Sequence, residues 1–488
     1  MGGESSFWSA LAWSLVRSGL LALIATLFAD GLGNWLARQA GVRTWRGRVL
    51  WGLLLTPWLT PGLVIGYCYR DTAMAWLATS WRTELLYDFI LLSQAVPVGV
   101  IMHRFAPRSR MAASALHCAQ LQRPRQRIFD TWHLRLWWQA RGQSLATVLA
   151  VLFLLIFQEA EVASLLQTHT WTEWMFTSQA KGLPVLVTLR YALIVVAAQS
   201  IAIVPVASWL ASSDWRSRRE AVAPSTNRGL PNWLAVGWLL FAFLLVTGIP
   251  LDQLLSGTQS GWGNLLHEPA LGSELGDAAL LAITTAGAVL FATRWGLSHR
   301  WPQWLMIALL LPGLLGGLPL GLGLAALFQT DILSMAYQGP VPLILGEVLL
   351  MFPRALLLVG LWQPARLSTG AHLAQLQAAS PVQGQRDSGR ELTWMLRGQH
   401  HWWCLWLVFY WAYFELMLPS LLAPPGFTPV SLVVYNFLHY GRIHALAAKL
   451  LLALLVPLGA MLLLTSMRRM WWPWFAPQTN QPEDARTP

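Results

Sequence analysis

Two polar segments of matching sequence stand between long apolar runs of this 488-residue chain. The first contains His117, Ala119, Gln120, Leu121 and Gln122, followed after a spacer by Leu134 and Arg135. The second contains His372, Ala374, Gln375, Leu376 and Gln377, followed after a spacer seven residues longer by Leu396 and Arg397. Short helices with apolar side chains can bind in a groove of another protein, so the pair predicts two docking sites. The alternative is that both segments are solvated connections whose arginines fix the topology.

A charged pair lies inside one apolar run of the second half. Glu347 and Arg354 are two helical turns apart on one face, and Pro353 stands beside the arginine. Charges within a membrane are costly, so they usually face a cavity or each other. Two interpretations follow, a lining of a pathway or a structural ion pair. The matching positions in the first half, Leu91 and Val98, are apolar, so either role would be asymmetric.

Three further carboxylates stand near the ends of apolar runs. They are Glu159, Glu161 and Glu415. We expect them at the outer mouth of the protein, where they would meet a cationic substrate or a delivering protein. The alternative is that they are simply hydrated at the membrane interface.

Prolines and glycines occur at matching places in two apolar runs. Pro57, Pro61 and Gly62 lie in the first, and Pro312, Gly316 and Gly317 lie in the second. These residues can interrupt a helix and free carbonyl groups for a gate at mid-membrane. Membrane helices also tolerate them for packing, so both interpretations stay open.

The remaining reactive residue types predict no metal site and no cofactor. The three cysteines are scattered, and no histidine spacing is typical of a metal site. The chain has no Gly-x-x-x-x-Gly-Lys-Ser/Thr motif, and its only lysines are Lys181 and Lys449. It therefore cannot bind ATP through a P-loop, and we expect no enzymatic activity of its own.

The composition requires a membrane. Hydrophobic residues make up 55% of the chain and charged residues only 11%, whereas soluble proteins carry about 25% charged residues. The net charge of +11 is spread over arginines in short loops, which argues against nucleic-acid binding. Runs of roughly 20 apolar residues predict about eleven spans in an all-α fold. They cover 11–32, 49–69, 85–103, 144–166, 188–210, 232–250, 276–296, 304–328, 341–361, 403–423 and 444–466.

Loop charge predicts the orientation of these spans. The basic loops are 38–48, 104–141, 211–231 and 364–402, and these belong on the cytoplasmic side. Neutral or acidic loops alternate with them without a break. Both polar segments are therefore expected on the same, cytoplasmic, face.

The two halves of the chain repeat. His117 and His372 are 255 residues apart, as are Pro57 and Pro312, and Glu159 and Glu415 are 256 apart. This constant spacing predicts two tandem units of parallel orientation with a pathway between them. The expected parts are a first transmembrane unit at 1–212, a cytoplasmic linker at 213–231, a second transmembrane unit with an extra leading span at 232–470, and a disordered cytoplasmic tail at 471–488.

This pattern resembles the permease subunit of binding-protein-dependent ABC importers, and most of all the fused two-unit permeases of the ferric-iron and thiamine type. The likeness covers almost the whole chain, and the outer loop around Glu415, Pro419 and Pro424 is especially similar. In that family a cytoplasmic Glu-Ala-Ala loop with a following glycine docks in a groove of the ATPase. Here Gln122 and Gln377 stand at the glycine position, so the motif is altered in both copies.

The resemblance implies an all-helical permease of the bacterial inner membrane. Its implied partners are ABC ATPase subunits, a soluble substrate-binding protein and the lipid bilayer. The alternative is a secondary carrier not coupled to ATP, or an inactive scaffold with the permease fold. Iron, thiamine, polyamines and inorganic anions all remain open as substrates.

Overall fold

The described part of the chain is all-helical, and several of its helices are long and apolar enough to cross a membrane. The computed structural model describes residues 2–39, 44–76, 79–105, 143–211, 229–265, 270–298, 301–366, 369–440 and 445–466, and these residues contain helices and no strand. Seven of the described helices are long and apolar enough to span a bilayer, and two bent helix pairs raise this number to nine.

The first half begins with a 38-residue helix and ends with a 27-residue one. Its helices are α1 (Gly2–Gln39), α2 (Trp45–Leu59), α3 (Gly62–Ala75), α4 (Ser80–Phe105), α7 (Gln143–Phe157), α8 (Glu161–Leu166), α9 (Trp171–Ala180) and α10 (Val185–Ala211). Threonine hydroxyls cap α2 and α9. The side-chain oxygens of Thr44 and Thr170 accept hydrogen bonds from the Gly47 and Glu173 backbone N–H groups.

An additional span separates the halves. It consists of α12 (Asn232–Phe243), a π-helical segment η3 (Leu244–Gly248) and α13 (Ile249–Leu265). The preceding residues pack on α1, since the Leu230 N–H donates to the Gly31 carbonyl at 3.2 Å and Gly229 lies against Trp35. Most of the predicted linker and the whole predicted tail lie outside the described residues.

The second half contains the remaining helices. They are α14 (Leu271–Ser298), α15 (Gln303–Leu314), α16 (Gly317–Phe328), α17 (Ser334–Tyr337), α18 (Val341–Arg366), α19 (Thr369–Ala378), α20 (Gln383–Thr393), the π-helical η4 (Trp394–Gly398), α21 (Gln399–Tyr413), α22 (Met417–Leu422), α23 (Val430–Tyr440) and α24 (Leu446–Ser466). A 15-residue helix followed by a 6-residue helix occurs in both halves, as α7–α8 and as α21–α22.

Four predicted continuous spans are interrupted. The runs 144–166 and 403–423 stop at Phe157 and Tyr413, and a short helix follows each stop. The runs 49–69 and 304–328 are bent pairs, α2–α3 at 72° and α15–α16 at 105°. At the first two interruptions a carboxylate binds the backbone of the following helix, since Glu159 accepts from the Val162 and Ala163 N–H groups and Glu415 accepts from the Met417 N–H.

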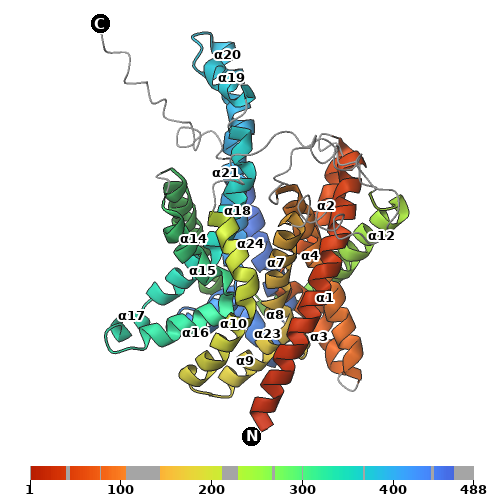
Figure 1. Ribbon diagram of the computed structural model, residues 1–488, viewed down its shortest axis with the longest axis vertical. Helices are drawn as coiled ribbons and strands as arrows, with labels where there is room; N and C mark the ends of the chain where they lie inside the picture. The colour runs from red at the N-terminus through yellow and green to blue at the C-terminus, as the bar shows by residue number, and fades with distance from the viewer. Residues whose placement is uncertain are drawn as a thin grey trace, which may run out of the picture.

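The halves pack closely against each other. Helix α10 of the first half packs on α15 and α16, while α13 packs on both α3 and α24. Within each half, glycines permit close packing of the helix after the bend on a short helix, since a Cβ on Gly66 of α3 would lie 2.2 Å from Leu165 of α8 and one on Gly321 of α16 would lie 2.7 Å from Leu421 of α22. In Figure 1 the α19–α20 hairpin lies at one end of the molecule, and α9, α16 and α17 lie toward the other.

Candidate functional site

The two bent helix pairs form the centre of the candidate site. Helix α2 ends at Leu59 and α3 begins at Gly62, while α15 ends at Leu314 and α16 begins at Gly317. Gly316 has φ 91° and ψ 162°, a conformation that a residue with a side chain rarely adopts. Each break leaves carbonyl groups without a partner in their own helix, and these groups need donors from elsewhere.

Side chains of the opposite half supply those donors. The Tyr410 hydroxyl of α21 donates to the Leu59 carbonyl of the first half. The Gln158 amide donates to the Leu314 carbonyl at 2.6 Å, and the Gln199 amide of α10 donates to the Leu315 carbonyl at 3.1 Å. Each break is therefore bonded across the contact between the halves.

Two of the predicted outer carboxylates lie at the helix starts just beyond the breaks. A Cβ on Gly62 would be 2.6 Å from the carboxyl carbon of Glu161, and a Cβ on Gly317 would be 3.2 Å from Glu415 Oε1. Helix N-termini attract negative charge, and glycine lets the carboxylates approach the backbone. The structure thus brings Pro61, Gly62, Gly316 and Gly317 together with residues that the sequence placed separately.

The third predicted outer carboxylate, Glu159, is bound within the protein. It accepts hydrogen bonds from the Tyr87 hydroxyl at 2.7 Å and from the Val162 and Ala163 N–H groups at 2.6 and 3.0 Å. Glu415 likewise accepts from the Met417 N–H at 3.1 Å. Glu159 and Glu415 therefore cap the short helices α8 and α22. The prediction of an outer mouth did not include this role.

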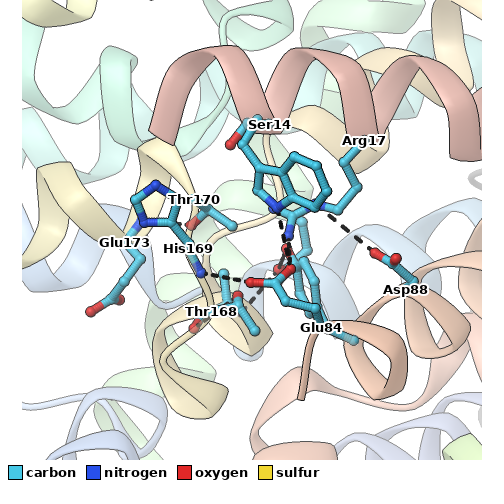
Figure 2. A network of polar contacts seen from close by, with 12 residues as sticks. Ser14, Arg17, Glu84, Asp88, Thr168, His169, Thr170 and Glu173 are labelled. Carbon is cyan, nitrogen blue, oxygen red and sulfur yellow. Dashed lines mark hydrogen bonds and ion pairs between the residues drawn. The ribbon is translucent and has the colours of Figure 1, made fainter. Parts of the chain in front are cut away.

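An ion network in the first half is centred on the buried Arg17 and includes Glu84 and Asp88 (Figure 2). Arg17 of α1 is bonded to Glu84 and lies 4.0 Å from Asp88, and its guanidinium stands 4.8 Å from the centre of the Tyr87 ring. Glu84 also accepts from the His169 N–H at 3.0 Å. Sequence reasoning missed these residues, although an arginine within one predicted span and two acidic residues four apart around the start of another were a usable signal.

Glu347 and Arg354 do not form a direct ion pair. Glu347 is 0% exposed, and neither of its carboxylate oxygens has a hydrogen-bond partner among the described residues. Arg354 is exposed, donates to the Met351 sulfur at 3.5 Å, and lies 6.0 Å from the centre of the Trp411 ring. The structural-pair interpretation is thus wrong as a direct contact, and the pathway interpretation stays a prediction.

The second half instead contains a different buried pair. Lys449 of α24, 0% exposed, donates to Glu274 of α14 at 2.7 Å. The sequence signal was available, because Lys449 is one of two lysines and stands inside a predicted span. This pair ties the first and last helices of the second half together.

The second polar segment forms a helical hairpin. Leu373 and Leu376 of α19 are 56% and 57% exposed, while Ala374 between them is buried. A Cβ on Gly389 would lie 2.2 Å from the Ala378 backbone nitrogen, so this glycine lets α20 pack directly on α19. Leu396 is half-buried in η4.

The first polar segment cannot be placed in the same way. Its predicted docking residues lie outside the described part of the chain. They are His117, Ala119, Gln120, Leu121, Gln122, Leu134 and Arg135. The flanking helices α4 and α7 have their described ends on the side of the molecule where the α19–α20 hairpin lies (Figure 1).

The last two of the predicted helix-breaking residues lie inside helices. Pro57 and Pro312 lie within α2 and α15.

Among the described residues, no group of three or more histidine, cysteine, aspartate or glutamate side chains is arranged to hold a metal ion. Comparison with known proteins adds no family, since no protein-family model, curated protein or solved structure matches the chain.

Proposed function

We propose that this chain is the transmembrane permease subunit of an ATP-driven importer of the ABC class. One chain would supply both transmembrane units of the translocation pathway, and the ATPase subunits would be separate proteins. A soluble binding protein would deliver the substrate on the opposite face. The corresponding location is the bacterial inner membrane.

The observation that carries the proposal is the α19–α20 hairpin. It lies beyond the ends of the long apolar helices and exposes Leu373 and Leu376, one turn apart on α19. Exposed leucines on a short helix are suited to a hydrophobic groove of a partner. Because Gly389 fixes α20 against α19, the hairpin would transmit a movement of the partner to α18 and α21, which flank it.

The contact between the halves supports an alternating movement. Hydrogen bonds from Gln158, Gln199 and Tyr410 cross that contact at the breaks. If closure of the ATPase pair moved the hairpin, the bent helices of one half would shift against the donors of the other. A change of these few bonds would convert an outward-open state to an inward-open state.

The exposed Arg354 supports a water-accessible interior. It stands within the span α18, beside Trp411 of α21, and it acts electrostatically on Glu347 and Glu415. A guanidinium in that position would be costly in lipid, so it is expected to face hydrated space. A pathway between the units provides such space.

Co-purification tests the proposal. We expect the tagged full chain to bring down an ATPase, and we expect Leu373→Asp with Leu376→Asp to lose it, because two charges cannot enter an apolar groove. Met335→Asp is the matched control, since Met335 is 91% exposed and lies in α17, far from the hairpin. Retention of the ATPase by the leucine variant, or its absence from the unmodified chain, would reject the proposal.

A carrier without ATP coupling is the second candidate. The observation in its favour is Glu347, a fully buried carboxylate with no hydrogen-bond partner in the described structure. Such a group inside a span can bind and release a proton during transport. Uptake into liposomes driven by a pH gradient without an ATPase, and lost in Glu347→Gln, would establish this candidate instead.

A further inference from the structure

A pocket between the halves has a lining that suits one class of solute. Its volume is about 470 Å³, within the range of about 300–1,000 Å³ that small-molecule sites occupy. Helices α9 and α10 of the first half form one side, and α16, α17, α22 and α23 of the second half form the other. Of these elements, α9, α16 and α17 lie toward the end opposite the α19–α20 hairpin (Figure 1).

None of the residues lining this pocket carries a formal charge. Polar groups come from three amides, Gln179, Gln329 and Asn436, and from hydroxyls that include Tyr337. Glu173 stands one turn before Phe176, but it is not part of the lining and accepts instead from the Thr177 hydroxyl at 2.7 Å. A charged solute would therefore lose its hydration without gaining an opposite charge.

The amides keep hydrogen-bonding capacity for a ligand. Gln179 uses its nitrogen to donate to the Thr188 hydroxyl at 2.6 Å, and Gln329 uses its nitrogen to donate to Tyr337 at 3.2 Å. Their amide oxygens remain as acceptors, and the Tyr337 hydroxyl keeps its proton as a donor. Asn436 is exposed and its side chain makes no hydrogen bond within the described structure, so its donors and its acceptor are both unused.

Aromatic and aliphatic side chains provide the apolar part of the lining. The Phe176 and Tyr435 rings meet edge to face, with centroids 5.5 Å apart, and Leu322 and Ala325 of α16 face the same cavity. A ligand with polar edges and an apolar face would match both kinds of surface. Neutral sugars and nucleosides have this chemistry.

The first half shows what fills the matching space. Counted from Gly62 and Gly317, Tyr67 stands where the second half has Leu322, and Arg70 stands where it has Ala325. Tyr67 lies against Gly257 of α13, and Arg70 donates to the His439 carbonyl at 3.5 Å. The smaller residues of α16 leave the second half open at this position.

We infer that this pocket binds an uncharged, hydrogen-bonding solute of monosaccharide to nucleoside size. The inference rests on the proposed function, because it names the class of substrate that the permease would receive on the side opposite its ATPases. Ferric iron, polyamines and inorganic anions are all charged, so the inference distinguishes this chain from importers of those substrates.

The test uses the purified full chain in detergent, without an ATPase. The neutral probes are glucose, inositol and uridine at millimolar concentration. Their charged counterparts are glucose 6-phosphate and glucosamine for glucose, inositol monophosphate for inositol, and uridine monophosphate for uridine. The readout is a saturable increase in melting temperature. We expect at least one neutral probe to give the increase and its charged counterpart to give a smaller increase or none.

Variants locate the binding in the pocket. Ala325→Trp fills the cavity and should abolish the increase, whereas Leu327→Trp on the same helix, at a residue 51% exposed and outside the lining, should retain it. Asn436→Leu removes the hydrogen bonds that this exposed amide would make to the solute, and should weaken the apparent affinity about threefold to tenfold.

Three outcomes would overturn the inference. They are an increase with charged probes alone, no increase with any neutral probe, and an increase that survives both Ala325→Trp and Asn436→Leu. Because no ATPase is present, these outcomes leave the co-purification result unaffected. Conversely, loss of the permease proposal would leave a measured binding of neutral solute in place.

Discussion

The two halves of the molecule hold their bent helices and their buried charges in different ways. In the first half, η3 of the additional span packs beside the break, where Thr60 and Thr247 share a hydrogen bond of 2.7 Å and Tyr69 donates to the Leu245 carbonyl at 2.7 Å. In the second half, the break is bonded by Gln158 and Gln199 of the first half. The first-half break is thus bonded by the additional span and by Tyr410 of the second half, whereas the second-half break is bonded by side chains of the first half.

The charged side chains within the spans also differ between the halves in the partners they have. The first half surrounds Arg17 with acidic and aromatic partners and gives Glu159 three donors. The second half leaves Glu347 without a partner in the described structure, and Arg354 stays exposed beside it. Unpaired charges lower stability, and proteins keep them mainly at functional positions. The difference concerns these groups and not the halves as wholes, because Lys449 and Glu274 of the second half form a buried ion pair and Glu161 Oε1 of the first half has no hydrogen-bond partner in the described structure.

The largest expected effect separates the two arginines. Arg17→Met would leave Glu84 and Asp88 without their cation, and breaking a buried pair in this way costs about 3–5 kcal/mol of stability. Arg354→Met would change stability by much less, because Arg354 is exposed and has no ion-pair partner within 4 Å among the described residues. Denaturant unfolding of both variants in the same detergent measures the difference. Equal losses would show that the second half uses its arginine for stability as the first half does.

A pair of glutamate variants is expected to differ in sign. Glu159→Gln would turn an amide nitrogen toward backbone donors and should cost about 1–3 kcal/mol. Glu347→Gln would replace a buried carboxyl group that has no hydrogen-bond partner in the described structure, so it should be neutral or stabilising. Thermal unfolding at neutral pH measures both variants. A marked loss in Glu347→Gln would indicate that this carboxylate is satisfied after all.

The two breaks should respond unequally to the loss of their donors. Gln158→Leu removes the bond to the Leu314 carbonyl and one to Gln199, and should cost about 1–3 kcal/mol. Thr247→Val removes one bond between hydroxyls and should cost about 1 kcal/mol. Thr285→Val is the control, because the buried Thr285 hydroxyl has no partner in the described structure. A greater cost for Thr247→Val would place the more dependent break in the first half.

Much of the helix arrangement follows from local sequence, and the site does not. Runs of apolar residues locate the spans, and Pro61 with Gly62 or Gly316 with Gly317 stand where two of them bend. The sequence does not predict which residues pair with the charged side chains. Arg17 and Glu84 are 67 residues apart, and no periodicity within either helix encodes their contact.

The error on Glu347 and Arg354 has a related cause. A spacing of seven places two side chains on the same helical face, but it does not say whether other helices separate them. In the structure Arg354 turns to Met351 and Trp411, while Glu347 lies buried. For Glu159, the proximity to a loop suggested an exposed mouth, whereas its backbone donors in α8 bind it inside. Position along the chain predicted neither burial nor partner.

The last expected effect concerns a carboxyl group beside the contact between the halves. Burial raises the pKa of Glu173, in α9 outside the long spans, from 4.5 to about 7, and hydrogen bonds from Thr177 and Ser164 and the charge of Lys181 offset this only in part. Between these values the unfolded chain loses the proton first, so stability falls as the pH rises from 4.5 through 7. Glu173→Gln cannot lose a proton, so the variant should gain melting temperature relative to the unmodified chain at pH 8 and show little difference at pH 4. Because α9 lines the pocket through Phe176 and Gln179, this pH dependence reports on the first-half wall of that pocket, and an equal difference at both pH values would mean that Glu173 is ionised normally.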